Sequence, residues 1–78
     1  MNNLKTKYII KGQIENHEAY FIKFTSKLIF NTNFKVRICT SNINEATKYN
    51  NLSDAQKICN QLGEEFNVYK ITEPLIKK

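Results

Sequence analysis

The chain is poor in glycine, proline, histidine and cysteine, and it has no tryptophan. Its 78 residues include two glycines, one proline, one histidine and two cysteines. The glycines, Gly12 and Gly63, are too far apart to form the glycine-rich loop that cradles a phosphate group. His17 lies in a polar turn segment with no nucleophile beside it, which is typical of a surface residue. These absences predict a protein that is not an enzyme and that uses no cofactor.

The two cysteines, Cys39 and Cys59, stand outside any Cys-x-x-Cys motif. A disulfide, a metal site and a reactive thiol are all conceivable. Two small buried side chains in a reducing compartment are the more economical interpretation, because free cysteine is among the most buried residue types. Two cysteines and one distant histidine are too few ligands for a zinc site. We therefore expect no metal site.

Long hydrophobic runs are absent as well. No run approaches the roughly 20 apolar residues that a membrane-spanning helix needs, and the first residues do not read as a signal peptide. Hydrophobic residues make up 41% of the chain, which is enough for one packed core. We expect a single domain over residues 1–78, with a flexible tail at 74–78 and no membrane partner. The expected location is the cytoplasm of the cell that makes the protein, or of the host cell.

Charge of one sign prevails, since twelve basic residues face seven acidic ones and give a net charge of +5. This excess favours an acidic partner such as nucleic acid. Eleven of the twelve basic residues are lysine, which, like the abundant asparagine and isoleucine, has AT-rich codons. The sequence leaves open whether the charge reflects function or codon bias.

The first half of the chain alternates apolar and polar residues with a period of two, which predicts half-buried strands. The segments 7–14, 19–25 and 34–40 show this alternation, and Ser26–Phe30 could prolong the second of them. Polar residues at 15–18 and an Asn-Thr-Asn turn at 31–33 connect them. Three antiparallel strands in a meander are the simplest arrangement of these segments.

Residues 51–63 predict one amphipathic helix. Asn51 is placed to cap its first turn, Asp54 lies at the positive end of the helix dipole, and Gly63 follows its last turn. Apolar residues between them recur at intervals of three and four, which gives one buried face. A strand over 66–72 follows, and residues 45–49 could add a short strand before the helix. The fold class is therefore α+β, with an antiparallel sheet of four to five strands and one helix packed on one face.

A single helix covers one face of such a sheet, so we expect the other face to meet water or a partner. If Ile10, Ile22, Phe24, Val36 and Ile38 face the helix, alternation places a basic set on the open face. That candidate partner-binding set is Ile9, Lys11, Phe21, Lys23, Lys35 and Arg37. It could bind an acidic protein surface, stack a nucleic-acid base on Phe21, or be an ordinary solvated face. A Lys35→Glu, Arg37→Glu double variant should then fold normally.

One pattern near the helix is shared with a known group of proteins. Ala46, Tyr49, Asn51 and Ala55 form the pattern A-x-x-Y-x-N-x-x-x-A, and a strand ending in "VYKIT" follows. Over about the last 35 residues the chain resembles small uncharacterised proteins of phages and prophages from low-GC Gram-positive bacteria. The resemblance implies a short cytoplasmic accessory protein that binds host components, a group that includes inhibitors of CRISPR–Cas immunity. It carries no functional residues with it, because the pattern describes the start of a helix.

These observations together predict a phage-encoded, non-enzymatic binding protein, an anti-CRISPR inhibitor that blocks its target sterically. The expected partner is a host protein or ribonucleoprotein complex. The alternative is a small basic nucleic-acid-binding protein or phage regulator, and a structural role in the phage particle is a third reading. An exposed strand edge could also pair two copies into a homodimer.

Overall fold

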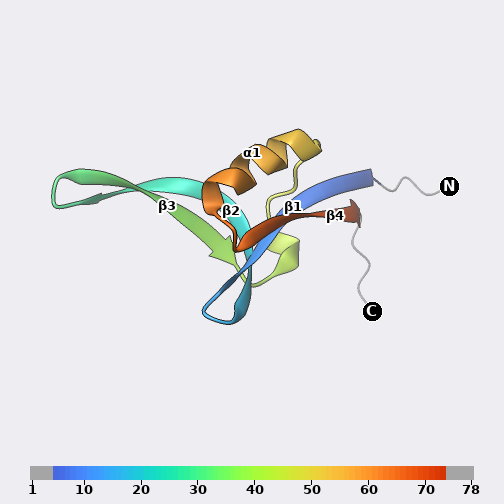
Figure 1. Cartoon of the computed structure of the whole chain (residues 1–78), viewed down its shortest axis with the longest axis horizontal. Helices are drawn as coiled ribbons and strands as arrows, with labels where there is room; N and C mark the ends of the chain where they lie inside the picture. The colour runs from blue at the N-terminus through green and yellow to red at the C-terminus, as the bar shows by residue number, and fades with distance from the viewer. Residues whose placement is uncertain (1–4, 74–78) are drawn as a thin grey trace.

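The computed structural model describes residues 5–73 and contains four antiparallel strands and one α-helix (Figure 1). The elements are β1 (Lys5–Ile14), β2 (His17–Ile29), β3 (Thr32–Thr40), the 3-10 turn η1 (Ile43–Glu45), α1 (Leu52–Leu62) and β4 (Phe66–Glu73). The sheet order is β3-β2-β1-β4. The predicted α+β fold with one helix packed on the sheet is therefore confirmed. The tail expected at 74–78 lies outside the described residues.

The helix packs its apolar stripe on one face of the sheet. Ala55 and Cys59 of α1 are buried against Ile10, Phe21 and Phe66 of the strands. An eleven-residue helix is marginal by itself, so this packing stabilises it more than its own hydrogen bonds do. None of the helices within residues 5–73 is long and apolar enough to span a membrane.

The ends of α1 fall where the sequence predicts them, but the start is capped differently. Asn51 has the extended backbone of an N-cap residue, yet its side chain accepts no hydrogen bond from the first turn. Its amide group instead donates to the Asp54 carboxylate over 3.3 Å. At the other end, Gly63 has a φ of 102° and a ψ of −177°, a conformation that side-chain-bearing residues rarely adopt.

The opposite face of the sheet is not bare, contrary to our expectation. Ile9 and Tyr20 are buried there against Ala46, with Ile43 and Ile71 packed around them. The chain between β3 and α1 thus crosses this face and supplies a small second cluster. This short segment is sufficient to cover the face because only two strand residues, Ile9 and Tyr20, are buried there.

The same connection also enters the sheet itself. β1 and β2 pair with each other only next to their connecting turn, where Lys11–Ile14 lies beside His17–Tyr20. Beyond that point the backbone amide of Thr47 donates to the Phe21 carbonyl over 3.3 Å, and the Thr47 hydroxyl donates to the Ile22 carbonyl over 2.5 Å. Tyr49 exchanges two backbone hydrogen bonds with Tyr8 of β1, of 2.8 and 2.9 Å. Residues 47–49 therefore fill the gap where β1 and β2 diverge, but in place of the short strand expected at 45–49 they form only the single bridge at Tyr49.

Past this gap β2 and β3 pair with no other strand of residues 5–73 and continue as a projecting hairpin (Figure 1). The molecule is accordingly elongated, with extents of 55 × 26 × 20 Å. We call residues 23–38 the arm. Its two strands pair from Lys23 with Ile38 at the base to Ile29 with Thr32 at the far end.

Gly12 offers a direct test of the close packing between β1 and β4. A Cβ atom at this position would lie 2.5 Å from the Glu65 carbonyl oxygen and 2.6 Å from the Phe66 ring. We expect Gly12→Ala to lower the free energy of unfolding by about 1–3 kcal/mol, because Phe66 would have to leave its place in the core. Urea unfolding followed by circular dichroism measures this change. Gln13→Ala, at the exposed neighbouring position, is the control, and equal stability of the two variants would contradict the packing.

Candidate functional site

The six residues expected to share an open face do not lie on one face. Phe21 is only 1% exposed and belongs to the core beneath the helix, and Ile9, also 1% exposed, is buried on the opposite face. Lys35 and Arg37 reach the helix side of the molecule, whereas Lys23 is exposed on the other side of the hairpin. The prediction that these six residues form one binding surface is therefore wrong.

Two features of strand pairing cause this error. A β-bulge between Phe21 and Lys23 adds Ile22 to β2 and shifts its alternation by one residue. Phe21 and Phe24 consequently lie on the same side, with ring centroids 4.9 Å apart. Since Phe24 pairs with Arg37, β3 presents its odd-numbered residues to the helix side. Its apolar residues at 34, 36 and 38 face the other way. Of the five residues expected to face the helix, only Ile10 and Phe24 pack against that core.

Lys35 and Arg37 fasten the base of the arm to the body. The Lys35 ammonium donates a 2.6 Å hydrogen bond to Gln61 of α1 and lies 4.2 Å from the centroid of the Phe24 ring. The Arg37 guanidinium lies 5.1 Å from the centroid of the Phe66 ring. Cation–π contacts of this kind stabilise by about 0.5–1 kcal/mol each at exposed sites.

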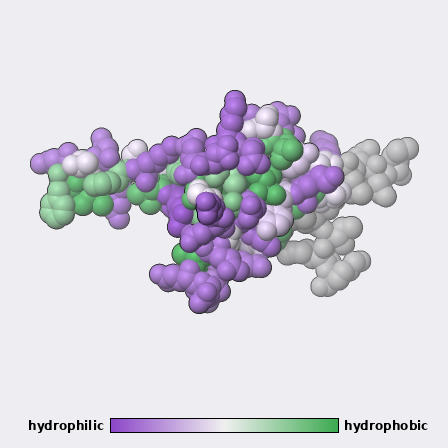
Figure 2. Space-filling model, in the orientation of Figure 1, coloured by the Kyte–Doolittle hydropathy of each residue, from purple (hydrophilic) through white to green (hydrophobic). Residues whose placement is uncertain are grey.

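The far end of the arm exposes large hydrophobic side chains. Leu28 is 65% exposed, Ile29 39%, Phe30 95% and Phe34 48%, and these are four of the six exposed large hydrophobic side chains in residues 5–73. Figure 2 shows apolar surface, mixed with polar residues, toward the end of the projecting hairpin. Single exposed apolar residues need no explanation, but a group of them at one place marks an interaction site. We call residues 28–34 the tip.

The turn of the tip carries an unusual residue. Phe30 and Asn31 form the two-residue loop between β2 and β3, with φ values of 50° and 62°. Asparagine tolerates this left-handed conformation, but it is unusual for a bulky residue such as phenylalanine. Glu15 and Asn16 of the turn between β1 and β2 adopt the same conformation, with φ values of 52° and 69°, so this is the ordinary geometry of a two-residue hairpin loop, and the tip is unusual only in placing a phenylalanine there. The turn leaves the Phe30 ring almost wholly in solvent.

The sequence contained one signal for this site. The apolar run Leu28-Ile29-Phe30 stands directly before the Asn-rich turn, where a hairpin needs polar residues and no core is available to receive apolar ones. The expected extension of the second strand over this segment is correct as far as Ile29, but the exposure of its side chains was not expected.

Charge distinguishes the arm from the rest of the chain. The arm contains Lys23, Lys27, Lys35 and Arg37 and no aspartate or glutamate. Its net charge is +4, which leaves only +1 for all other residues together. A lysine excess caused by codon usage alone would not exclude carboxylates from one hairpin.

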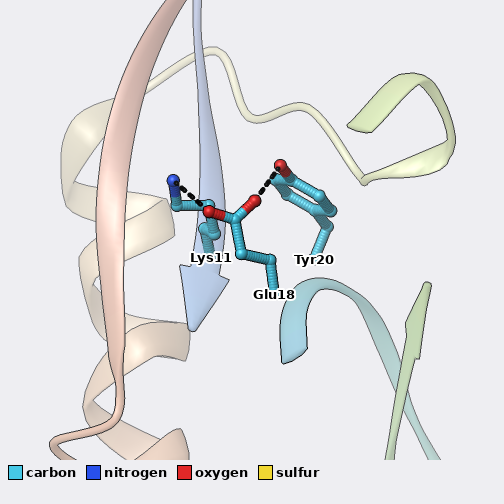
Figure 3. A network of polar contacts seen from close by, with 3 residues as sticks. All are labelled: Lys11, Glu18 and Tyr20. Carbon is cyan, nitrogen blue, oxygen red and sulfur yellow. Dashed lines mark hydrogen bonds and ion pairs between the residues drawn. The ribbon is translucent and has the colours of Figure 1, made fainter. Parts of the chain in front are cut away.

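A second polar cluster lies on the face opposite the helix. Glu18 is 3.7 Å from the Lys11 ammonium and accepts a 3.2 Å hydrogen bond from the Tyr20 hydroxyl (Figure 3). Burial, followed by the hydrogen bond to Glu18, raises the pKa of Tyr20. Lys11 also lies 4.7 Å from the centroid of the Tyr69 ring. Lys11 and Glu18 compensate each other, and the adjoining pocket of about 210 Å³ is lined by no serine, threonine, cysteine or histidine.

The remaining chemistry-bearing residues form no reactive group. Burial raises the pKa of the Cys59 thiol, which donates a 3.2 Å hydrogen bond to the Phe66 carbonyl oxygen. Burial also raises the pKa of Cys39, against a smaller lowering by Arg37. Both cysteines are free thiols. Within residues 5–73, no three His, Cys, Asp or Glu side chains are close enough to hold a metal ion. An open groove of about 620 Å³ between α1 and β4 is lined mainly by amides and apolar side chains.

Comparison with known proteins returned no matching family model, no similar curated protein and no similar solved structure. The arm, with its apolar tip and uncompensated positive charge, is therefore the candidate site on physical grounds alone.

The facing of β3 can be tested by charge reversal. We expect Lys35→Glu with Arg37→Glu to lower the free energy of unfolding by about 1–2 kcal/mol, because both cation–π contacts and the bond to Gln61 are lost. Thermal unfolding followed by circular dichroism measures this. The matched control is Lys23→Glu with Lys27→Glu, which changes the charge equally on the other side of the arm and should stay within about 0.5 kcal/mol of the parent. Equal effects of the two pairs would contradict the assigned faces.

The buried thiols and phenols predict a loss of stability in alkali. The folded-state pKa values of Cys39, Cys59, Tyr20 and Tyr49 are all raised, chiefly by burial, so the folded chain holds these protons more tightly than the unfolded chain. Their contribution is present below the unfolded pKa of cysteine, about 8.5, and is lost as pH rises through the folded values. The urea midpoint should fall between pH 7 and pH 10. A constant midpoint over this range would show that these groups are as solvated as in the unfolded chain.

Proposed function

We propose that the chain is a non-enzymatic binding protein whose arm engages its partner, and that it inhibits a host defence complex. The observation that carries this proposal is the exposed apolar tip at the end of a projecting hairpin. Complete burial of a Leu, Ile or Phe side chain contributes about 1.5–3 kcal/mol. Four such side chains supply enough to offset a large part of the cost of association.

The shape of the arm supports inhibition by steric blocking. Its seven residue pairs extend about 23 Å at 3.3 Å per residue, which is long enough to occupy a groove or channel in a partner. The body behind the arm then blocks whatever lies at the mouth of that groove. An inhibitor of this kind needs no catalytic group.

The resemblance to phage accessory proteins supports the choice of partner. It directs the proposal to bacterial defence complexes, and to CRISPR–Cas effectors first, because these are ribonucleoproteins that hold nucleic acid, whose phosphates attract an arm of charge +4, in long channels.

The proposal is tested by challenging bacteria that carry active CRISPR–Cas systems with a targeted phage. Expression of the protein should restore plaque formation against at least one system. Leu28→Ser with Phe30→Ser should reduce that restoration more than tenfold, because the partner would lose several kcal/mol of apolar burial.

Leu52→Ser is the matched control, since Leu52 is also exposed, at 52%, but lies on α1 away from the arm. It should inhibit as the parent does, and all variants should show parental circular dichroism. Failure to inhibit any system in a panel from low-GC Gram-positive bacteria, or full inhibition by the tip variant, would contradict the proposal.

A further inference from the structure

The positive charge of the arm lies on both of its faces. Lys35 and Arg37 stand on the side of the helix, and Lys23 and Lys27 alternate onto the other side. A flat acidic protein surface could meet only one of these faces at a time. The grooves of a nucleic-acid duplex are flanked by phosphates along both walls, so a ribbon that enters one edge-on meets anions on both of its faces.

The width of the arm fits the same ligand. The major groove of B-form DNA is about 12 Å wide and admits a two-stranded β-ribbon. The arm is such a ribbon, because within residues 5–73 β2 and β3 pair only with each other beyond the bulge. Its length of about 23 Å lies alongside several phosphates of each strand, since duplex DNA carries one charge per ~1.7 Å of its axis.

The tip combines an aromatic ring with amide groups. Phe30 is 95% exposed at the extreme end, and Asn31, Thr32 and Asn33 follow it directly. A bilayer or a dry apolar pocket would bury the side-chain amides of Asn31 and Asn33 without partners. A duplex offers base faces and steps for the ring, and base edges and phosphates for the amides.

Other binding partners fit the arm less well than duplex DNA does. A second copy docked arm to arm would bring two +4 hairpins together, and their like charges would repel. Protein–protein interface cores are enriched in Tyr, Trp and Arg and depleted in Lys, whereas three of the four cations of the arm are lysine. Lysine is a normal phosphate ligand.

We infer that the arm binds double-stranded DNA, with its four cations against phosphates and Phe30 against the bases. The inference rests on the proposed role of the arm as the binding element and names its ligand. An inhibitor built this way shields DNA that the defence complex must read, or enters the complex along its bound duplex.

Fluorescence anisotropy of a labelled 20-base-pair DNA duplex tests the inference. Four phosphate contacts predict a log–log salt slope of about −3.6, so the affinity should fall roughly a hundredfold between 50 and 200 mM salt. Lys23→Ala with Lys27→Ala should reduce the slope by about 1.8. Lys57→Ala with Lys70→Ala removes the same charge outside the arm and should leave the slope unchanged.

Phe30→Ala separates stacking from charge. It should weaken binding by about tenfold or more at constant salt slope, because one base contact of the ring is lost. Tyr69→Ala, which removes an exposed ring of the body, is the control and should bind as the parent does. Thermal unfolding of each variant verifies that it folds.

Absence of binding at 50 mM salt would overturn the inference, as would equal losses from the arm and body lysine pairs. If the tip variant loses inhibition while the parent binds no DNA, the proposed function stands with a protein ligand and the inference fails. If the arm binds DNA but the protein protects no phage, the inference stands and the inhibitory role fails.

Discussion

The point at which β2 leaves the sheet determines the rest of this structure. Thr47 holds β2 there through hydrogen bonds to the carbonyls of Phe21 and Ile22. The same connection pairs with β1 through Tyr49, so it fills the space that a continuing β1–β2 ladder would occupy. Because β2 loses β1 as a neighbour at this point, everything beyond it projects as a hairpin. The arm is thus a consequence of where a loop enters the sheet.

The bulge beside that loop explains which part of the molecule the sequence could predict. Local signals were sufficient for α1, since Asn51, Asp54 and Gly63 mark its ends and its apolar spacing needs no partner to be recognised. The strands were also visible from their alternation. Which face each strand turns to the helix was not, because the extra residue Ile22 brings Phe21 to the same side as Phe24, and because the pairing of Phe24 with Arg37 turns the apolar residues of β3 away from the helix. An isoleucine at position 22 is compatible with either strand register, so the sequence does not reveal the bulge.

The exposure of the tip could not be derived from the sequence either, but here the reason is a different one. Leu28, Ile29 and Phe30 have the composition of a buried strand, and burial depends on whether other elements reach them. In a chain of this size the helix covers the four-stranded part of the sheet, and within residues 5–73 no further element packs on the hairpin. A two-stranded hairpin without a packed face is marginally stable in water. The stability of the arm therefore depends on its base, where Phe24, Lys35 and Arg37 contact one another or the body.

The cations of the arm consequently have two different physical roles. Lys35 and Arg37 are held over aromatic rings and fix the direction in which the arm projects. Within residues 5–73, Lys23 and Lys27 form no hydrogen bond or ion pair, so they can meet an anion without losing a contact. An anionic ligand that reached all four would compete with the ring contacts at the base while gaining the two free lysines outright. If the arm binds DNA as inferred, binding of the polyanion would therefore be coupled to the direction of the arm, and the free pair, on the face turned away from the helix, would provide the first attachment.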